Sequence, residues 1–241
     1  MYRSAFLILL SGIVTGLTSL FVVSIYPFLS RGEFTIHKVA RKWARILLAI
    51  TGVDTRITGS DNVYLGRPQI FMANHQSVFD ILVVLAHIPA QFRWIAKKEL
   101  FEVPVFGDAL RRTGSIQIDR KHHVSAVESI DEAARKIREG KSVMTFPEGT
   151  RSQPGQLRPF KKGVFHLALK AGVPIVPIAI IGSGEVMATK SMRIRTGKIL
   201  LVVDKPIMTD EYSVENIDSL IERVHEVIRQ NYEEGRKEMN L

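Results

Sequence analysis

The chain contains no cysteine. This absence excludes disulfide bonds, thiolate zinc sites, iron–sulfur clusters and cysteine nucleophiles. The patterns Gly-x-Ser-x-Gly, Gly-x-Gly-x-x-Gly and His-Glu-x-x-His are missing as well. Gly140-Lys141-Ser142 does not end a nucleotide-binding P-loop, because Arg135 stands where the first glycine is required. The usual sequence patterns for nucleotide binding, for zinc proteases and for a covalent serine or cysteine nucleophile are therefore absent.

Internal repeats and low-complexity linkers are also absent, and the composition is that of a globular protein. Of the 241 residues, 46% are hydrophobic and 24% are charged, which excludes disorder and collagen. The length suits one α/β domain with an appendage. From about residue 55 onward, short apolar runs alternate with helical patterns. This alternation predicts an α/β fold with a central, mostly parallel sheet covered by helices.

The expected elements follow from apolar runs, helical spacing and the positions of glycine and proline. The expected strands are residues 69–74, 93–97, 115–118, 142–146, 175–181 and 199–203. The expected helices are residues 77–87, a stretch that is interrupted by Pro104 and ends at Arg112, and residues 125–139, 163–171 and 213–234.

Positive charge is concentrated in the body of the chain. The net charge is +9, yet residues 210–241 hold nine acids and four bases, a net −5, so the first 209 residues carry +14. A basic body suits a polyanion, such as nucleic acid, an anionic membrane surface or a phosphorylated substrate. A basic surface that only keeps the protein soluble is the alternative.

Residues 5–30 contain no charged side chain, and these 26 positions are long enough to cross a bilayer as a helix. A signal peptide is the alternative, but its apolar region is usually about 7–15 residues and precedes a small-residue cleavage site. The run here ends at Tyr26-Pro27-Phe28-Leu29, which is a poor cleavage site. One base precedes the run, and five follow within 15 residues. If the run spans, the positive-inside rule predicts an inner-membrane protein whose catalytic domain faces the cytoplasm. A helical hairpin that dips into one leaflet gives the same compartment.

Residues 34–53 form a basic amphipathic pattern. Such a pattern is typical of a helix that lies on anionic phospholipid headgroups; a core-packing helix with a basic solvent face is the alternative. We therefore expect residues 1–52 to be a membrane-anchoring helical segment and residues 53–241 to be the α/β domain. The apolar positions are Val39, Trp43, Ile46, Leu47 and Ile50, and the bases are Lys38, Arg41, Lys42 and Arg45.

The strongest candidate for chemistry is the segment from Asn74 to Asp80. If His75 lies in the turn after a strand and Ser77 is the N-cap of the next helix, Asp80 falls at the third helical position and its carboxylate can point back to the imidazole. A carboxylate on one ring nitrogen leaves the other nitrogen free to act as a base. Without a serine or cysteine nucleophile, such a pair favours activation of a substrate hydroxyl. The alternative is a helix-capping pair beside a turn histidine.

Two further segments have features that suit phosphate binding. Arg120 ends one expected strand, and the sequence from Phe146 to Ser152 leaves another strand with Arg151, followed by Arg158, Lys161 and Lys162. Arginines at strand ends lie where open α/β sheets bind ligands, and a guanidinium group suits phosphate. Gly149, beside Glu148, allows the backbone to approach a ligand closely. Each feature is weak evidence when taken alone.

Taken together, these segments resemble the glycerolipid acyltransferase family, in particular the 1-acyl-sn-glycerol-3-phosphate (lysophosphatidic acid) acyltransferases. Four motifs occur in that family's order over about residues 60–205. One departure is Gln117, where relatives often have an aromatic or aliphatic residue. The motifs are the Asn-His-x4-Asp box at Asn74, His75 and Asp80, the Gly-x-Ile-x-Ile-Asp-Arg segment at Gly114 to Arg120, the Phe-Pro-Glu-Gly-Thr-Arg-Ser box at Phe146 to Ser152, and the Val-Pro-Ile-Val-Pro strand at Val173 to Pro177.

The resemblance implies transfer of an acyl group from acyl-CoA or acyl-carrier protein to the sn-2 hydroxyl of lysophosphatidic acid, which gives phosphatidic acid. No metal or redox cofactor is implied. The implied site roles are His75 as the base, Asp80 as its orienting partner, Arg120 and Arg151 as phosphate ligands with Lys161 as a helper, Glu148 as the group that orients the glycerol or an arginine, and backbone N–H groups near Gly149 and Thr150 as oxyanion donors.

Two other functions compete with this interpretation. One is the same chemistry on another acceptor, such as glycerol-3-phosphate or a different lysophospholipid. The other is a non-catalytic protein that binds anionic membranes, although the intact pair of His75 and Asp80 argues against it. We expect no nucleic-acid partner, because no recognition motif and no stacking aromatics interleaved with the bases occur.

Overall fold

The computed structural model describes the backbone of residues 2–118 and 123–241, and the side chains of residues 2–118 and 129–241. Within these ranges seven strands form one sheet. Five neighbouring strands run parallel, and two strands at one edge run in the opposite direction, so the expected α/β fold with a mostly parallel sheet is confirmed. The strands are β1 (Asp54–Thr58), β2 (Ile70–Ala73), β3 (Phe92–Lys97), β4 (Ile116–Ile118), β5 (Ser142–Thr145), β6 (Ile175–Ile181) and β7 (Lys198–Val203). Their order across the sheet is β1-β7-β6-β2-β5-β3-β4.

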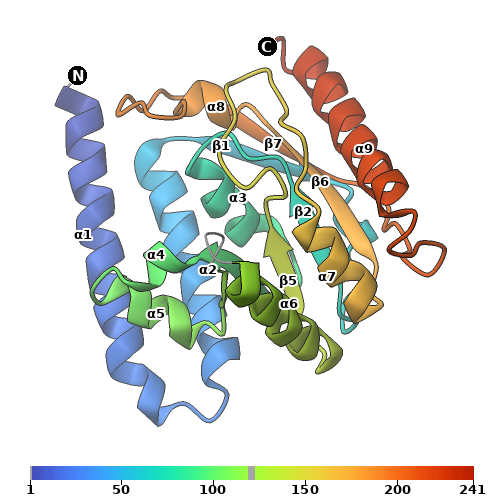
Figure 1. Ribbon diagram of the computed structural model, residues 1–241. Helices are drawn as coiled ribbons and strands as arrows, with labels where there is room; N and C mark the ends of the chain where they lie inside the picture. The colour runs from blue at the N-terminus through green and yellow to red at the C-terminus, as the bar shows by residue number, and fades with distance from the viewer. Residues whose placement is uncertain (1, 119–122) are drawn as a thin grey trace.

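Helices cover both faces of this sheet (Figure 1). Alternate residues of each strand point to opposite faces. Phe71 and Ala73 of β2 therefore pack toward α2 and α3, whereas Ile70 and Met72 pack toward α6, α7 and α9. The longer helices are α1 (Tyr2–Ile25), α2 (Gly32–Thr51), α3 (Phe79–His87), α6 (His123–Arg138), α7 (Gly163–Ala171) and α9 (Ile217–Glu238), and the shorter ones are α4 (Lys98–Phe101), α5 (Phe106–Arg112), α8 (Ser183–Val186) and the 3-10 turns η1 (Tyr26–Phe28) and η2 (Ser60–Asn62).

The local sequence explains where most of these elements lie. Strand β6 is buried on both faces, as its uninterrupted apolar run predicts for a central strand. Helix α7 ends at Gly172, whose φ of +64° suits glycine. The stretch that contains Pro104 divides into α4 and α5, and Val105 between them has a φ of +64°.

Strand β1 was not expected from the sequence. All its residues except Ile57 are polar, and the strand lies at the edge of the sheet, where it pairs only with β7 among the described residues. Pairing with a partner more than 140 residues later in the chain supplies its conformation. Strand β7 itself is antiparallel to β6, which makes the sheet mixed.

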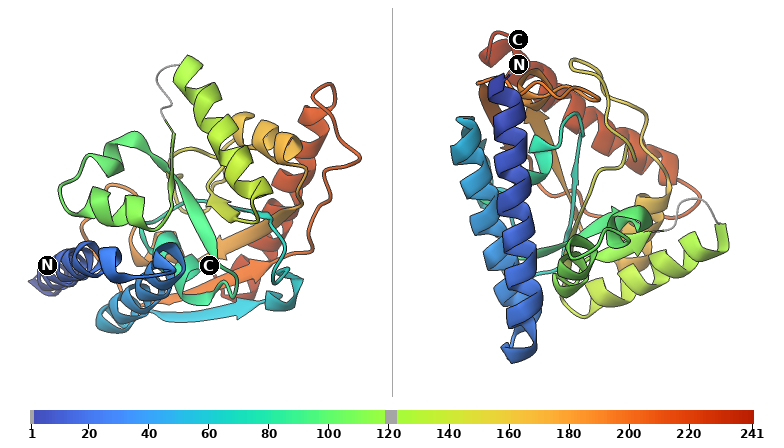
Figure 2. Two further views of the ribbon diagram at one scale, coloured as in Figure 1. Left: turned by 90° about the horizontal axis from the view of Figure 1, so that it is seen from below. Right: turned by 90° about the vertical axis from the view of Figure 1, so that its left-hand side faces the viewer.

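The N-terminal helices pack against the domain and against each other. Helix α1 contacts α2 and α5, and α2 contacts α3 (Figure 2). Segment Tyr2–Phe28 is long and apolar enough to cross a membrane, which indicates membrane association. The division of the chain at residues 52 and 53 stays a prediction.

Helix α2 packs on the core of the protein, and its expected contact with phospholipid headgroups stays a prediction. Ala44, Leu47 and Leu48 belong to the core beneath it. The side chain of Arg45 donates to the carbonyl oxygen of Ala86 at 3.1 Å, and that of Arg41 donates to Pro89 at 3.3 Å. These two arginines therefore satisfy carbonyl groups at the C-terminal end of α3, a place that favours cations.

The parallel strands β2, β5 and β3 end at the same edge of the sheet. In open α/β sheets the carboxyl ends of the strands form the usual ligand site. His75 and Phe146 follow β2 and β5, and Lys97 is the last residue of β3. The fold therefore brings the loop that contains His75 and the loop that begins at Phe146 to the same edge of the sheet.

Candidate active site

His75 and Asp80 are in direct contact. Nδ1 of His75 lies 2.7 Å from Oδ2 of Asp80, and the imidazole is 15% exposed whereas the carboxylate is fully buried. The same carboxylate oxygen accepts the backbone N–H groups of Gln76 at 2.7 Å and of Ser77 at 2.8 Å. Because that oxygen acts as an acceptor, Nδ1 of His75 carries the proton, and Nε2 is left as the potential base.

The local geometry differs from the expected cap. Helix α3 begins at Phe79 with Val78 as its N-cap residue, so Asp80 occupies the second helical position and not the third. The hydroxyl of Ser77 donates to the carbonyl oxygen of Met187 at 2.7 Å. Asp80 itself therefore binds the N–H groups of the turn, and this is why its carboxylate reaches the histidine.

Glu148 connects the loop after β5 to the His75 turn. Its Oε1 accepts the backbone N–H of His75 at 2.7 Å, and its Oε2 accepts that of Arg158 at 3.1 Å. Ser152 N–H donates to the carbonyl oxygen of His75 at 2.8 Å. Burial raises the pKa of Glu148, and the two backbone N–H groups and Ser152 oppose that rise. The carboxylate is 2% exposed, and its proposed contact with glycerol or an arginine stays a prediction.

A tight turn starts this loop. The N–H of Gly149 donates to the carbonyl oxygen of Phe146 at 3.0 Å, and Gly149 has a φ of +76°, which favours glycine. Because the Gly149 N–H is used inside the turn, the Thr150 N–H is the better of the two expected oxyanion donors. Both residues line the cavity described next.

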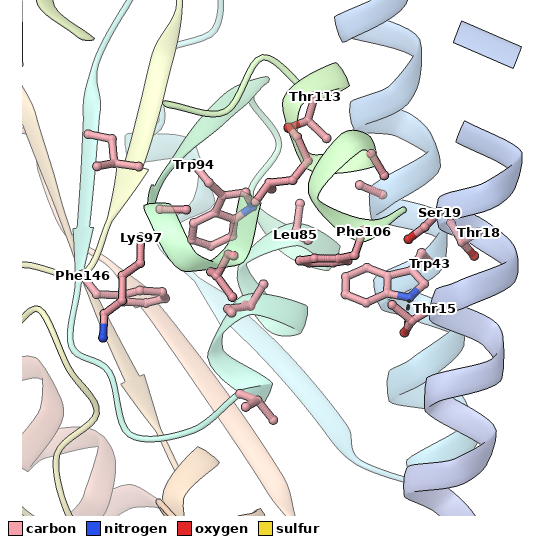
Figure 3. A pocket seen from close by; sticks show the side chains of 18 of the residues that line it. Thr15, Thr18, Ser19, Trp43, Leu85, Trp94, Lys97, Phe106, Thr113 and Phe146 are labelled. Atoms are coloured by element: carbon pink, nitrogen blue, oxygen red, sulfur yellow. Dashed lines mark hydrogen bonds between the residues drawn. The ribbon is translucent and has the colours of Figure 1, made fainter. Parts of the chain in front are cut away.

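An aromatic column leads from His75 into an apolar cavity. The ring of Phe146 stacks on the imidazole with centroids 4.0 Å apart and planes 9° apart, and Trp94 stacks on Phe146 at 5.7 Å. The cavity has a volume of about 410 Å³, and its lining includes His75. It extends from Phe146 to Thr15 and Ser19 of α1 (Figure 3). At its far end the indole of Trp43 donates to the hydroxyl of Thr15 at 3.1 Å. The lining includes Thr15, Ser19, Trp43, Leu85, Trp94, Phe106, Phe146 and Arg151.

The expected phosphate ligands do not all gather at this cavity. Arg151 lines it together with His75, whereas Lys161 lies exposed outside the lining and donates its backbone N–H to Pro147 at 2.9 Å. Arg120 lies outside the described residues. Lys97 also lines the cavity beside Phe146 (Figure 3). The sequence analysis missed this lysine, although its place at the end of a strand is the signal that singled out Arg120.

Among the described side chains, those of residues 2–118 and 129–241, no group of three metal-ligating residues gathers. The expectation that the reaction needs no metal or redox cofactor stays a prediction. What the described site can do follows from its own groups, which are a histidine base with a fixed tautomer, a neighbouring arginine and an apolar cavity.

A His–Asp pair at the carboxyl ends of parallel strands suits an enzyme that activates a hydroxyl group. The model of the family "Acyltransferase" matches residues 54–181, which is more than half of the chain. The chain belongs to the acyltransferase family, whose members act in phospholipid biosynthesis and phosphatidic acid formation.

Individual relatives agree with this assignment. The 1-acyl-sn-glycerol-3-phosphate acyltransferase of Cocos nucifera is 36% identical over 194 residues, which cover 80% of this chain and 62% of the relative. The enzyme of the same name from Limnanthes douglasii is 35% identical over 80% of this chain and 68% of its own length. The chain thus spans about two thirds of the length of these relatives.

A solved structure extends the similarity to nearly the whole chain. The 1-acyl-sn-glycerophosphate (LPA) acyltransferase PlsC from Thermotoga maritima superimposes with a TM-score of 0.75 at 28% identity. The match covers 93% of this chain and 95% of that one. The similarity therefore extends well beyond residues 54–181, the span of the family model.

Proposed function

We propose that this protein transfers an acyl group from an acyl thioester to the sn-2 hydroxyl of 1-acyl-glycerol-3-phosphate and so forms phosphatidic acid. The observation that carries the proposal is the 2.7 Å contact between His75 and Asp80 at the mouth of an apolar cavity that Arg151 also lines. The names of the relatives, which are 1-acyl-sn-glycerol-3-phosphate acyltransferases, support the choice of acceptor.

The proposed reaction has two steps and no acyl-enzyme. Nε2 of His75 takes the proton of the sn-2 hydroxyl while that oxygen attacks the thioester carbonyl carbon. The resulting oxyanion is held by backbone N–H groups at Thr150. When the intermediate collapses, the carbon–sulfur bond breaks, the imidazolium returns the proton to sulfur, and a free thiol leaves. Asp80 stabilises the imidazolium throughout.

Substrate binding follows from the two kinds of surface in the cavity. Arg151 and Lys97, which line the cavity, are the proposed ligands of the acceptor phosphate, with Arg120 and Lys161 as further proposed ligands. The apolar walls suit an acyl chain, because burying each methylene contributes about 0.8 kcal/mol. Either acyl-CoA or acyl-carrier protein serves as the donor, and no resident metal or redox cofactor takes part.

We further propose that α1 holds the protein at the inner membrane, with the catalytic domain on the cytoplasmic side and anionic phospholipid as its partner. The lysolipid and the product both reside in the bilayer, and the cavity reaches α1 at Thr15 and Ser19. A short path from lipid to His75 therefore runs through the protein.

Product identification tests the proposal. Purified protein in detergent is incubated with radiolabelled lysophosphatidic acid and, in turn, with acyl-CoA and acyl-carrier-protein thioesters, and the lipid product is separated and identified. Glycerol-3-phosphate and a lysophospholipid with a larger headgroup are offered as competing acceptors. We expect phosphatidic acid as the main product; conversion only of a competing acceptor would contradict the proposal.

A further inference from the structure

Helix α9 lies outside the span that the family model matches, yet its Tyr232 reaches both loops of the candidate active site. Tyr232 is 1% exposed. Its hydroxyl donates to Oε1 of Gln76 at 3.0 Å and accepts the backbone N–H of Gly155 at 3.1 Å. One hydroxyl thus joins the turn that carries His75 to the loop that follows Arg151.

Gln76 is the centre of this buried network. Its backbone N–H is one of the donors that hold Oδ2 of Asp80, at 2.7 Å. Its side-chain amide donates to the carbonyl oxygen of Gln156 at 3.0 Å and to that of Gln153 at 3.3 Å. A movement of the Gln76 side chain would therefore shift the loop on one side and the Asp80–His75 pair on the other.

The surroundings of Tyr232 hold it firmly in place. Arg236 donates to the Tyr232 hydroxyl at 3.4 Å and to Glu185 of α8 at 2.9 Å. A Cβ added at Gly235 would lie 2.9 Å from Ile181, so α9 packs closely on β6. The hydroxyl of Tyr232 and both polar atoms of the Gln76 side chain have partners, and buried groups that are satisfied in this way rigidify what they connect.

Helix α8 approaches the same network from another side. A Cβ added at Gly184 would lie 2.9 Å from the ring of Pro154 and 3.3 Å from Oε1 of Gln76. The loop after Arg151 and the Gln76 amide are therefore confined between α8 and α9. This contact is independent of the Tyr232 hydroxyl, and it provides a second way to disturb Gln76.

We infer that Tyr232 is a positioning residue for the acyl transfer. Through Gln76 it holds the His75–Asp80 turn and the loop at residues 152–156 in one fixed arrangement. The inference rests on the proposed function, because its effect is measured on that reaction. Tyr232 lies behind the loops and contacts them from α9, so it acts on the catalytic pair and not on the substrate.

The first test compares Tyr232→Phe with Tyr212→Phe, a control in a partly buried tyrosine on the same face of the sheet. Loss of the hydroxyl leaves the Gly155 N–H and Oε1 of Gln76 without this partner, so we expect kcat to fall roughly tenfold. The KM for the thioester should stay within about twofold, and Tyr212→Phe should match the wild type within about twofold. A lower Tm with an unchanged kcat would show a merely structural role and would overturn the inference.

Two further measurements make the result decisive. In a double-mutant cycle with Gln76→Leu, the two losses in kcat should not add, because both act through one network; additive losses would contradict the inference. Hydrogen exchange should speed up at residues 75–77 and 152–156 in Tyr232→Phe and not in β7, and unchanged exchange there would also overturn it.

The remaining outcomes are also informative. If Tyr232→Phe does not fold, Gly184→Ala displaces Gln76 from the side of α8 and should give the same loss of kcat; full activity of Gly184→Ala would then overturn the inference. If the wild type makes no phosphatidic acid, the proposed function fails, and the hydrogen-exchange comparison still tests whether Tyr232 ties the two loops together.

Discussion

The two ends of the cavity differ in which side chains are buried and which are exposed. At the catalytic end, Gln76, Ser77 and Asp80 are fully buried and hydrogen-bonded within the protein. At the other end, Ser19 of α1 is buried beside the cavity, whereas Leu17 is 64% exposed. The other exposed large apolar residues of α1 are Tyr2, Phe6, Leu9, Ile13, Leu20 and Phe21.

Comparison with α9 shows that an apolar outer surface is a feature of α1 and is not shared by this other long helix. Leu220, Val224 and Ile228 of α9 face the core, and its outer surface is charged, as expected in water. An extended apolar outer surface favours an apolar medium. The catalytic end is held by internal hydrogen bonds, whereas the outer surface of α1 supports the proposal that lipid surrounds this helix.

The largest effect should come from the catalytic end. His75→Ala removes the proposed base, which typically contributes about 10²–10⁴-fold, so kcat should fall at least 100-fold. Binding to vesicles should not change, because α1 is intact. His166→Ala in α7 is the matched control and should keep full turnover. A His75→Ala enzyme with more than about a tenth of wild-type turnover would remove the base assignment.

Arg151→Ala should have the next largest effect. A hydrogen bond to a charged group contributes about 1.5–3 kcal/mol, so kcat/KM for lysophosphatidic acid should fall roughly 10- to 150-fold. Acylation of a monoacylglycerol, which lacks phosphate, should change little, and Arg193→Ala on the surface should leave both substrates unaffected. Equal losses with both acceptors would show that Arg151 does not bind the phosphate.

Leu17→Asp tests the membrane end. Full burial of a leucine contributes about 1.5–3 kcal/mol, so partitioning onto phosphatidylcholine–phosphatidylglycerol vesicles should weaken about 10- to 100-fold. Activity in detergent should persist, because Leu17 points away from the cavity. Ser219→Asp on the outer surface of α9 is the control, measured by vesicle flotation. Equal partitioning of Leu17→Asp and wild type would show that α1 does not insert.

The smallest expected effect is a dependence of the free energy of unfolding on pH, caused by His37 of α2. Burial, aided by Arg93 and Arg41, lowers the pKa of His37 to about 3. Because the folded pKa lies below the unfolded value of 6.5, its stability contribution is complete above that value and is lost as the pH falls. From pH 7 to pH 5 this loss is on the order of 2 kcal/mol. Thermal unfolding of His37→Leu at the two pH values should show a smaller decrease than the wild type; an equal decrease would contradict the assignment.

The sequence was most informative where chemistry and local structure coincide. The pairing of His75 with Asp80 was predictable, because a short turn between β2 and α3 brings them together. The two motif loops were predictable because they follow neighbouring parallel strands. Strand β1 was not, since its polar residues become a strand only by pairing with β7.

Contacts between distant segments explain the remaining differences. The Tyr232–Gln76 contact joins residues 156 positions apart, so no local sequence pattern predicts it. The bonds of Arg41 and Arg45 to carbonyl groups of and after α3 were not predictable either, because only the folded chain brings these groups near. Lys97, in contrast, could have been found by the strand-end criterion that selected Arg120.

The central claim is direct acyl transfer by the His75–Asp80 pair without an acyl-enzyme. Because the chain contains no cysteine, a thiol reagent detects only the thiol released from acyl-CoA. Thiol release and phosphatidic acid formation should be counted together, with and without lysophosphatidic acid. The account predicts one thiol per phosphatidic acid and release only when the acceptor is present. A stoichiometric burst of thiol without acceptor, together with a protein whose mass has increased by one acyl group, would contradict it.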